Sequence, residues 1–581
     1  MMPTPIQHLA LACVALALLA GPGCDAPEES APGDLDLKVL ALTGGSCQDT
    51  DNPTPNVDPF ADISKVTVKV SGTRSDGSYG SLARETQALS AGQTTVVVHD
   101  IPETQAGPHR LELFAEGSTK SWYASDPAVV VERNTTNDVN LLLSPYGGFS
   151  CIPTGTNFPN VVFPAVTELG DGRVLITGGF TGLVTEDVTG DQKLSGATDR
   201  AFIWNPTKGT LEETQSAMPE GRAAHAAVFI PGSGFGKVLL IGGADSLDVD
   251  TAQDFPFELD LAKARQDYTI FDVATETFTE GKGLLDLKRA FPRAHLMADN
   301  TVVITGGGEW PIPDSAYELV EVFDIAREET ETNGGLLSTF GFADNWLRSG
   351  HSLTFIRNID QGLTTLLVYG GMYDDPSASS DPNRVASVMV QSNNQKGGDN
   401  GVFANVEIYG QEWPPYTYFH EMTRLSDDRM VLTGGVRTDG NKMKAPQDDE
   451  AWLMVYDYDS SEGKHRLLVT KVPGMGAGRT FHTALSGDGE HLAVVGGMGA
   501  SNIAISDDPI RFFSPTDTKS GEWATAPDSA GFAPRAWQGA VTHPSGATLF
   551  VGGESTLSDL DVSNPTRAFL ELYTPSNIPK P

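Results

Sequence analysis

The sequence predicts an all-β protein in which a small antiparallel β-sandwich precedes a ring of seven repeats. Three observations favour this class. Glycine and proline account for 62 and 37 of the 581 residues, so turns are frequent. No long stretch beyond the extreme N-terminus has the periodicity of an amphipathic helix. From residue 160 onward, a short apolar run that ends in Gly-Gly recurs seven times.

Residues 1–23 have the pattern of an export signal. Residues 9–20 form an apolar run too short to span a bilayer, and small residues follow it. The stretch LLAGPGC ends at Cys24 and resembles the lipobox of bacterial lipoproteins, in which the cysteine is lipidated and becomes the mature N-terminus. This resemblance implies a lipid anchor at Cys24, a tether over 24–36 and an exported protein of the cell envelope, at the cell surface or in the periplasm. The alternative is an ordinary signal and a secreted protein.

Two cysteines remain in the expected mature body, Cys47 and Cys151. In an oxidising compartment they are a natural disulfide pair, which would tie the start of the first domain to its exit. The loop-entropy relation gives such a bond roughly 4–5 kcal/mol as an upper figure. The alternative is two free thiols in a reducing cytosol.

The first predicted domain covers residues 37–146. It begins with the apolar strand LKVLAL and continues with runs in which apolar and polar residues alternate between turn-forming residues. Five or more such strands within this length indicate an antiparallel, Ig-like β-sandwich. The expected strands after the first are 63–72, 94–101, 109–117, 127–134 and 137–145.

The seven Gly-Gly doublets recur at a nearly constant spacing. Their second glycines are residues 179, 243, 307, 371, 435, 497 and 553, so the intervals are 64, 64, 64, 64, 62 and 56 residues. Before each doublet comes a short stretch, here called the Arg/His segment, such as GRAAHAAV, RSGHSLT or GRTFHTAL. After each doublet come an insertion and an apolar strand that ends in aromatic residues, such as YTIFDVATETF or FLELYTP.

Together these three features resemble the kelch motif. The resemblance implies that residues 147–581 form a seven-bladed β-propeller in which each repeat is one four-stranded blade. A single sheet of this kind cannot bury both faces alone, and radial stacking buries them. The chain ends after the third strand of the seventh repeat, so we expect residues 147–157 to add the missing fourth strand and close the ring.

The order of the strands within a blade predicts on which face of the ring the candidate site lies. In an antiparallel blade, the insertions between the second and third strands gather on one face, and the Arg/His segments open onto that face. The candidate ligand-facing residues are Arg222, His225, Arg289, Arg348, His351, His420, Arg479, His482, Arg535 and Gln538. The alternative for the histidines is a structural role, which the kelch resemblance also implies. The arginines suit carboxylate ligands, or they pair with blade backbones or loop acids.

The net charge of the chain and the lack of certain motifs disfavour several classes of function. The net charge of −37 disfavours nucleic acid. We expect no cofactor, although the acidic insertions could hold Ca²⁺; solvated loop acids are the alternative. The copper chemistry of galactose-oxidase-like propellers needs a cysteine joined to a tyrosine, and no cysteine follows Cys151. We therefore expect a monomeric binding or scaffold protein that uses the insertion-rich face for a protein or glycan. The alternative is a sugar-active enzyme on the same face.

Overall fold

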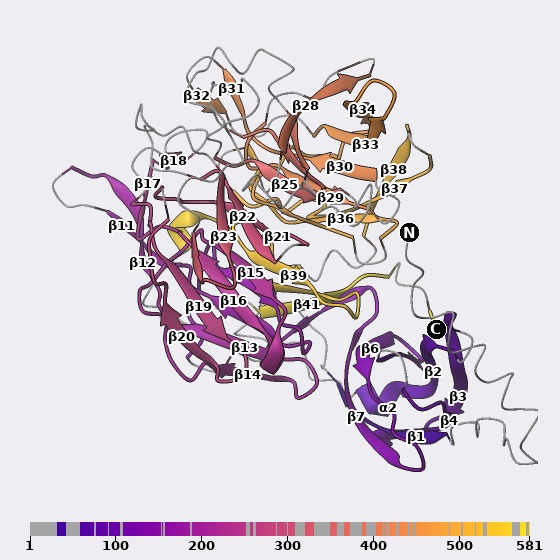
Figure 1. Ribbon diagram of the computed structural model, residues 1–581. Helices are drawn as coiled ribbons and strands as arrows, with labels where there is room; N and C mark the ends of the chain where they lie inside the picture. The colour runs from indigo at the N-terminus through magenta and orange to yellow at the C-terminus, as the bar shows by residue number, and fades with distance from the viewer. Residues whose placement is uncertain are drawn as a thin grey trace, which may run out of the picture.

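The computed structural model describes residues 32–41 and 59–581 with internal gaps, the longest at 308–319, 331–348, 357–364, 372–385, 391–401 and 561–569. The described chain is all-β. A seven-stranded, nearly closed sheet at the N-terminus lies beside a larger, propeller-like body of four-stranded units (Figure 1). None of the helices in this part of the chain has the length and apolar character that crossing a membrane requires.

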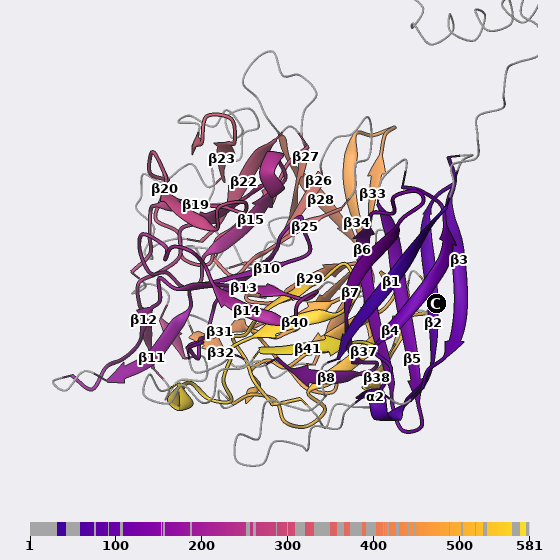
Figure 2. The same ribbon diagram turned by 90° about the horizontal axis from the view of Figure 1, so that it is seen from below.

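The N-terminal sheet has the strand order β3-β2-β5-β6-β7-β1-β4. Its strands are β1 (Gly33–Ala41), β2 (Ile63–Thr73), β3 (Tyr79–Ala88), β4 (Thr95–Ile101), β5 (His109–Gly117), β6 (Ser121–Val129) and β7 (Thr136–Pro145), and the short helix α2 (Pro59–Asp62) precedes β2. Alternate side chains point inward, as Leu35, Leu37 and Val39 of β1 show, and form one apolar core. Figure 2 shows these strands side by side along one flank of the molecule.

Four details of this sheet differ from the expectation. The strand expected at 127–134 lies earlier in the chain, as β6 (Ser121–Val129), and residues 130–134 form a loop and turn. Strand β1 begins at Gly33, inside the expected tether, because its buried alternation already starts at Leu35. Strand β1 pairs with β7 in parallel, so the sheet is not purely antiparallel. Strand β3 was not predicted, because its sequence YGSLARETQA has few apolar residues and its side chains are exposed or half-buried at a sheet edge.

The larger body consists of consecutive four-strand groups, here called units 1–7. Unit 1 contains β9 (Ala165–Glu168), β10 (Val174–Thr177), β13 (Ala201–Asn205) and β14 (Thr210–Glu213). Unit 2 contains β15 (Ala226–Ile230), β16 (Lys237–Ile241), β19 (Tyr268–Asp272) and β20 (Thr277–Glu280). Unit 3 contains β21 (Arg293–Leu296), β22 (Thr301–Thr305), β23 (Val320–Asp324) and β24 (Glu329–Thr330). Unit 4 contains β25 (Ser352–Phe355), β26 (Thr365–Tyr369), β27 (Ala386–Val390) and β28 (Val402–Tyr409). Unit 5 contains β29 (Glu421–Arg424), β30 (Arg429–Thr433), β33 (Ala451–Asp459) and β34 (Lys464–Val472).

Unit 6 contains β35 (Thr483–Leu485), β36 (Leu492–Val495), β37 (Ile510–Pro515) and β38 (Gly521–Thr525), and unit 7 contains β39 (Gly539–Thr542), β40 (Thr548–Val551), β41 (Leu570–Thr574) and β8 (Gly148–Cys151). The outer strands of units 4 and 5, β28 and β34, pair in parallel and merge the two units into one eight-stranded sheet.

The units close into a ring. The first strand of each unit contacts the first strand of the next, and β39 of unit 7 contacts β9 of unit 1. Strand β8 comes from the start of the body and pairs with β41, with Phe149 opposite Tyr573 and Ser150 opposite Leu572. The expected closure by residues 147–157 is confirmed, and β8 covers the edge that the C-terminal strand would otherwise leave open.

The Gly-Gly doublets join neighbouring units. Both glycines of a doublet have positive φ, for example 64° at Gly496 and 102° at Gly497. The second glycine donates its N–H to a carbonyl in the Arg/His segment of the next unit. These bonds are Gly179 to Arg222 (2.9 Å), Gly243 to Arg289 (2.7 Å), Gly371 to Thr417 (3.0 Å), Gly435 to Arg479 (2.8 Å), Gly497 to Arg535 (2.9 Å) and Gly553 to Val161 (2.8 Å). The last of these bonds joins unit 7 to unit 1.

Two insertions build a sheet of their own. Strands β11 (Phe180–Thr185) and β12 (Gln192–Ala197) from unit 1 pair with β17 (Leu247–Val249) and β18 (Phe257–Glu258) from unit 2, in the order β11-β12-β17-β18. The β11–β12 hairpin projects from the body in both views (Figures 1 and 2). A shorter hairpin, β31 (Arg437–Asp439) with β32 (Lys442–Lys444), belongs to the insertion of unit 5. The insertions therefore give this face of the ring a structure beyond the units.

The N-terminal sheet packs against the ring around β7, β8 and β41. The Tyr146 hydroxyl donates to the carbonyl of Ser576, and the backbone N–H of Gly147 donates to the carbonyl of Thr574 at 2.7 Å. Lys580 of the C-terminal tail lies over the rings of Phe114 and Tyr146 at 4.7 and 5.4 Å. The C-terminal tail therefore contacts the N-terminal sheet at this junction.

Candidate functional site

The arginines of the Arg/His segments lie inside their units. Arg222, Arg289, Arg479 and Arg535 are all 0% exposed. Arg222 donates to the carbonyl of Gly242 at 3.0 Å and pairs with Asp267, and Arg289 pairs with Glu321 at 2.6 Å. Arg535 pairs with the equally buried Glu571. The prediction that these arginines face a ligand is wrong, because each one uses its donors to hold its own doublet or third strand.

Arg479 shows the same role without a carboxylate partner. It donates to the carbonyls of Gly496 and Pro509 at 3.1 and 3.3 Å. Burial, with the nearby Arg511 as a smaller cause, lowers the pKa of Arg479 to about 10. Arg348 lies outside the described residues, so its placement stays a prediction.

The histidines join each unit to the one before it. The Nε2 atoms of His225, His351 and His482 lie 2.8 Å from the hydroxyls of Thr177, Thr305 and Thr433, each of which precedes the doublet of the preceding unit. His420 contacts Ser352 at 3.0 Å, and Gln538 takes the same position in unit 7, with its amide 3.2 Å from Thr483. The histidines are buried and bond to neighbouring units, but His225, His482 and Gln538 also line the channel cavity described below, so a ligand-facing role stays a prediction for them.

These buried histidines make the ring sensitive to acid. Burial, with Arg222 as a second cause, lowers the pKa of His225 from 6.5 to about 3. The unfolded chain therefore binds this proton first as the pH falls, so stability decreases from about pH 6.5 toward pH 3, by up to about 1.4 kcal/mol per pH unit for one histidine. Urea unfolding of His225→Gln at several pH values across this range is expected to show a free energy of unfolding that depends less steeply on pH, by the equivalent of about one bound proton. An unchanged slope would contradict this assignment.

Residues that were not singled out in the sequence line the axis of the ring. Each unit places one residue with a φ between 50° and 70° next to the axis; the seven, here called the central ring, are Phe163, Ala224, Phe291, Gly350, Phe419, Phe481 and Trp537. Backbone bonds link five of the seven neighbouring pairs: Phe163 to Trp537 (2.8 Å), Ala224 to Phe163 (3.0 Å), Phe291 to Ala224 (2.8 Å), Phe419 to Gly350 (2.7 Å) and Trp537 to Phe481 (3.4 Å).

The side chains of the central ring plug the axis. Phe163 packs edge-on against Phe291 and Phe481, with centroids 5.1 and 5.5 Å apart. Phe257 of β18 packs on Phe163 and Phe481 at 5.6 and 5.2 Å, so the sheet β11-β12-β17-β18, here called the accessory sheet, covers the ring on the insertion-rich face. The sequence signal was an aromatic residue directly before the histidine, proline or glutamine of most Arg/His segments.

A cavity of about 180 Å³ adjoins the central ring inside the channel. Its lining includes Arg293 and Glu421 from the first strands of units 3 and 5, and three of the predicted candidate residues, His225, His482 and Gln538. Burial raises the pKa of Glu421, and the guanidinium of Arg293, 3.9 Å away, partly offsets this effect. This pair is the nearest approach in the described channel to the Glu and Arg combination of a sugar-active enzyme.

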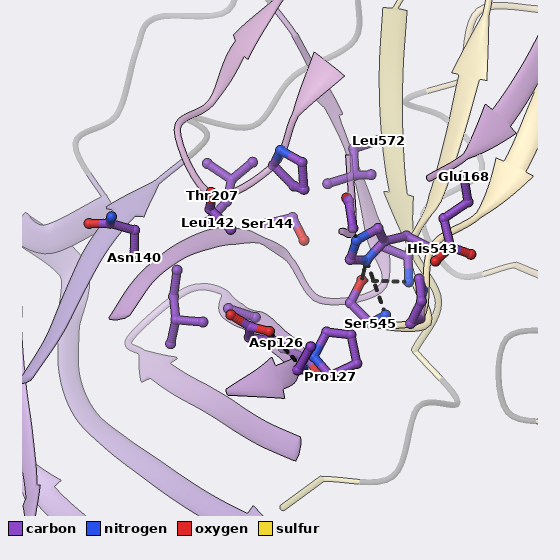
Figure 3. Close-up of a pocket in the computed structure, with 18 of the residues that line it drawn as sticks. Asp126, Pro127, Asn140, Leu142, Ser144, Glu168, Thr207, His543, Ser545 and Leu572 are labelled. Carbon is purple, nitrogen blue, oxygen red and sulfur yellow. Dashed lines mark hydrogen bonds between the residues drawn. The ribbon is translucent and has the colours of Figure 1, made fainter. Parts of the chain in front are cut away.

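A larger cleft, of about 320 Å³, lies between the N-terminal sheet and units 1 and 7. Figure 3 shows Asp126, Asn140 and Ser144 from the sheet, and Glu168 and His543 from the ring, around it. The turns on the ring side connect first to second strands and third to fourth strands. The cleft is therefore at the opposite end of the strands from the insertions.

The hydrogen bonds of His543 fix its tautomer. Its Nδ1 atom accepts the backbone N–H of Ser545 at 3.1 Å, so its Nε2–H donates to the carbonyl of Gly172 at 3.0 Å. Burial lowers the pKa of His543. Both nitrogens of the neutral ring are thus occupied, and the residue braces two turns at the wall of the cleft.

The other predicted sites fall largely outside the described residues. Cys24 and Cys47 do so, and Cys151 ends β8, so the lipidation and the disulfide stay predictions. Within the described part of the chain, no group of three or more His, Cys, Asp or Glu side chains could hold a metal ion. Several insertion acids are not described, including Asp254 and Asp374, so calcium binding also stays a prediction.

No protein-family model and no curated protein matches the chain. Among solved structures, it is similar to a fungal alcohol oxidase of the AA5 family in complex with copper, with 13% identity over 74% of this chain and 76% of that chain and a TM-score of 0.47. It is also similar to YjhT (12% identity, 63% and 99% covered, TM-score 0.38) and to RAG in complex with one melted and one unmelted RSS (11%, 73% and 98%, 0.37). The copper named for the first protein is a property of that protein.

Proposed function

We propose that the chain is an exported binding protein whose ring is a seven-bladed, kelch-like propeller. Its insertion-rich face binds a protein or glycan partner, and its Ig-like N-terminal domain and a lipid at Cys24 hold it at the cell envelope. The observation that carries this proposal is the accessory sheet β11-β12-β17-β18. Two insertions build it together on one face, while the described Arg/His segments are used within the ring.

The position of the N-terminal sheet also supports the insertion-rich face as the binding face. The sheet packs at the end of the strands where turns such as 170–172 and 543–547 lie. The insertions lie at the other end. An anchor that precedes the sheet would therefore leave the insertion-rich face turned away from the membrane and accessible to a partner.

The edge of the accessory sheet is the part of this face best suited to a partner. Strand β11 is the outermost strand of the sheet, and apart from a bridge between its first residue, Phe180, and Val162, no described residue pairs with its outer edge. Val184 of β11 is exposed to 46%. A free strand edge with an exposed apolar residue can accept a peptide strand, and the neighbouring insertions can contact a glycan.

Deleting the β11–β12 hairpin tests this proposal. Residues 182–195 would be replaced by a two-residue Asn-Gly turn, and the matched control would shorten the hairpin between β33 and β34 on the outside of the ring. Binding to a glycan array and to purified envelope proteins is expected to fall for the first variant and to persist for the control. Equal binding by both variants would overturn the proposal, and turnover of a bound glycan by NMR would favour the enzyme.

The anchor has a test of its own. Intact-mass spectrometry of the protein from its native membrane is expected to show a diacylated or triacylated N-terminal residue at Cys24. Cleavage at another bond, or an unmodified cysteine, would contradict the lipid anchor and leave the binding face untouched.

A further inference from the structure

The cavity beside the central ring, here called the channel cavity, has an aromatic wall and a charged wall. All seven residues of the central ring line it, and five of them are aromatic. Its volume of about 180 Å³ is somewhat larger than that of an apolar cavity of about 150 Å³ that binds benzene, so it suits a ligand of fewer than about ten non-hydrogen atoms. Arg293 and Glu421 face each other in the same lining, and their side chains are 44% and 35% exposed. A ligand that enters the channel therefore reaches both charged groups.

The two charged residues are exceptions at their position in the ring. The first residue of each unit's first strand lies opposite the residue that precedes the doublet. In units 3 and 5 this residue is Arg293 and Glu421, on either side of unit 4. In the other five units it is small and uncharged: Ala165, Ala226, Ser352, Thr483 and Gly539. Because five units form without a charge at this position, the fold of a unit does not require one there.

Arg293 and Glu421 do not satisfy each other. Nη2 of Arg293 and Oε1 of Glu421 lie 3.9 Å apart, which is longer than a hydrogen bond. Nε of Arg293 donates to the carbonyl of His351 at 3.3 Å, and no other described residue forms a hydrogen bond with this guanidinium or with the Glu421 carboxylate. Burial raises the pKa of Glu421 although Arg293 opposes this effect, so the negative charge is compensated only in part. The pair therefore keeps both donors and acceptors for a ligand.

We propose that the channel cavity binds a zwitterion, namely a small α-amino acid with an apolar side chain. Its carboxylate accepts hydrogen bonds from the terminal nitrogens of Arg293, its ammonium group donates to Glu421, and its side chain packs on the aromatic residues of the central ring. Only one carbon atom separates the two charged groups of an α-amino acid, so both reach partners that lie 3.9 Å apart. The site lies inside the ring. It goes beyond the proposed function and stands whether or not the insertion-rich face binds a partner.

Calorimetry on the full chain tests this site with three probes: L-valine, 3-methylbutanoate and isobutylamine. The second probe lacks the ammonium group of valine and the third lacks its carboxylate, while both keep the branched carbon skeleton. L-Valine is expected to bind, and each analogue to bind at least about tenfold more weakly, because it leaves Glu421 or Arg293 without a partner. Equal affinities for valine and either analogue, or no binding of valine, would overturn the proposal.

Variants assign the contacts. Glu421→Gln preserves shape and is expected to weaken the binding of valine about tenfold without weakening that of 3-methylbutanoate. Arg293→Met is expected to weaken the binding of valine to a similar extent without weakening that of isobutylamine. The matched control is Glu168→Gln, which changes a first-strand acid that lines the cleft beside the N-terminal sheet and not the channel cavity, and which leaves all three affinities unchanged. A melting temperature for each variant establishes that it is folded. Wild-type affinity for valine in either folded variant would contradict the site.

Discussion

Replacing Gly496 with alanine is expected to destabilise the protein by about 3 kcal/mol or more. Gly496 is the first residue of a doublet and has a φ of 64°. A Cβ atom there would lie 2.5 Å from the carbonyl oxygen of Arg535 in the next unit, a backbone atom that cannot move without opening the junction. Left-handed backbone costs a residue with a side chain roughly 1–2 kcal/mol, and overpacking adds typically 1–3 kcal/mol.

The matched control is Gly463→Ala in the turn between β33 and β34. Gly463 has nearly the same φ, 66°, but nothing lies within 4 Å of its added Cβ. This variant is expected to lose only the roughly 1–2 kcal/mol of the backbone term. Urea unfolding followed by tryptophan fluorescence measures both. Equal losses would show that the doublets serve as turns and do not lock neighbouring units together.

Replacing Arg535 with methionine is expected to cost about 3–5 kcal/mol, because it leaves Glu571 buried without its partner. Both side chains are 0% exposed, and the pair joins the Arg/His segment of unit 7 to β41, the strand that β8 covers. The double variant R535M/E571L removes both charges and is expected to recover most of the loss. Denaturant midpoints of the wild type, both single variants and the double variant give the coupling energy.

A ligand-facing arginine would behave differently. Its replacement would leave the stability unchanged or improve it, since binding residues are often held at a cost to the fold. A loss below about 1 kcal/mol for Arg535→Met would therefore contradict the structural role and return this residue to the list of candidate ligand contacts.

The sequence predicted the repeats and their closure because both depend on local pattern. The doublets recur at fixed spacing, and a chain that ends after a third strand needs an edge partner, which β8 supplies. The start of the N-terminal sheet was placed too late because acidic residues alternate with Leu35 and Leu37, so the strand resembles a tether at first. The accessory sheet was missed because it pairs insertions from two different units.

The roles of the arginines depended on partners far along the chain. Asp267, Glu321 and Glu571 lie in or beside the third strands of their units, more than 30 residues after the arginines that they hold. The second position of that strand contained part of the signal. It carries an acid in units 3 and 7, which have the arginine, and an aromatic residue, Phe202 or Trp452, in units 1 and 5, which lack it. Units 2, 4 and 6 have the arginine without an acid there, so this position alone does not predict the pairing.

Hydrogen exchange of the full chain tests closure of the ring most directly. Strand β8 belongs by sequence to the segment after the N-terminal sheet, yet it pairs along Gly148–Cys151 with the C-terminal strand β41. If this pairing completes the ring, the amide hydrogens of β8 exchange as slowly as those of β41 and become exposed with them in one cooperative step. Exchange of the β8 amides by local opening, far faster than that of β41, would contradict the closed ring.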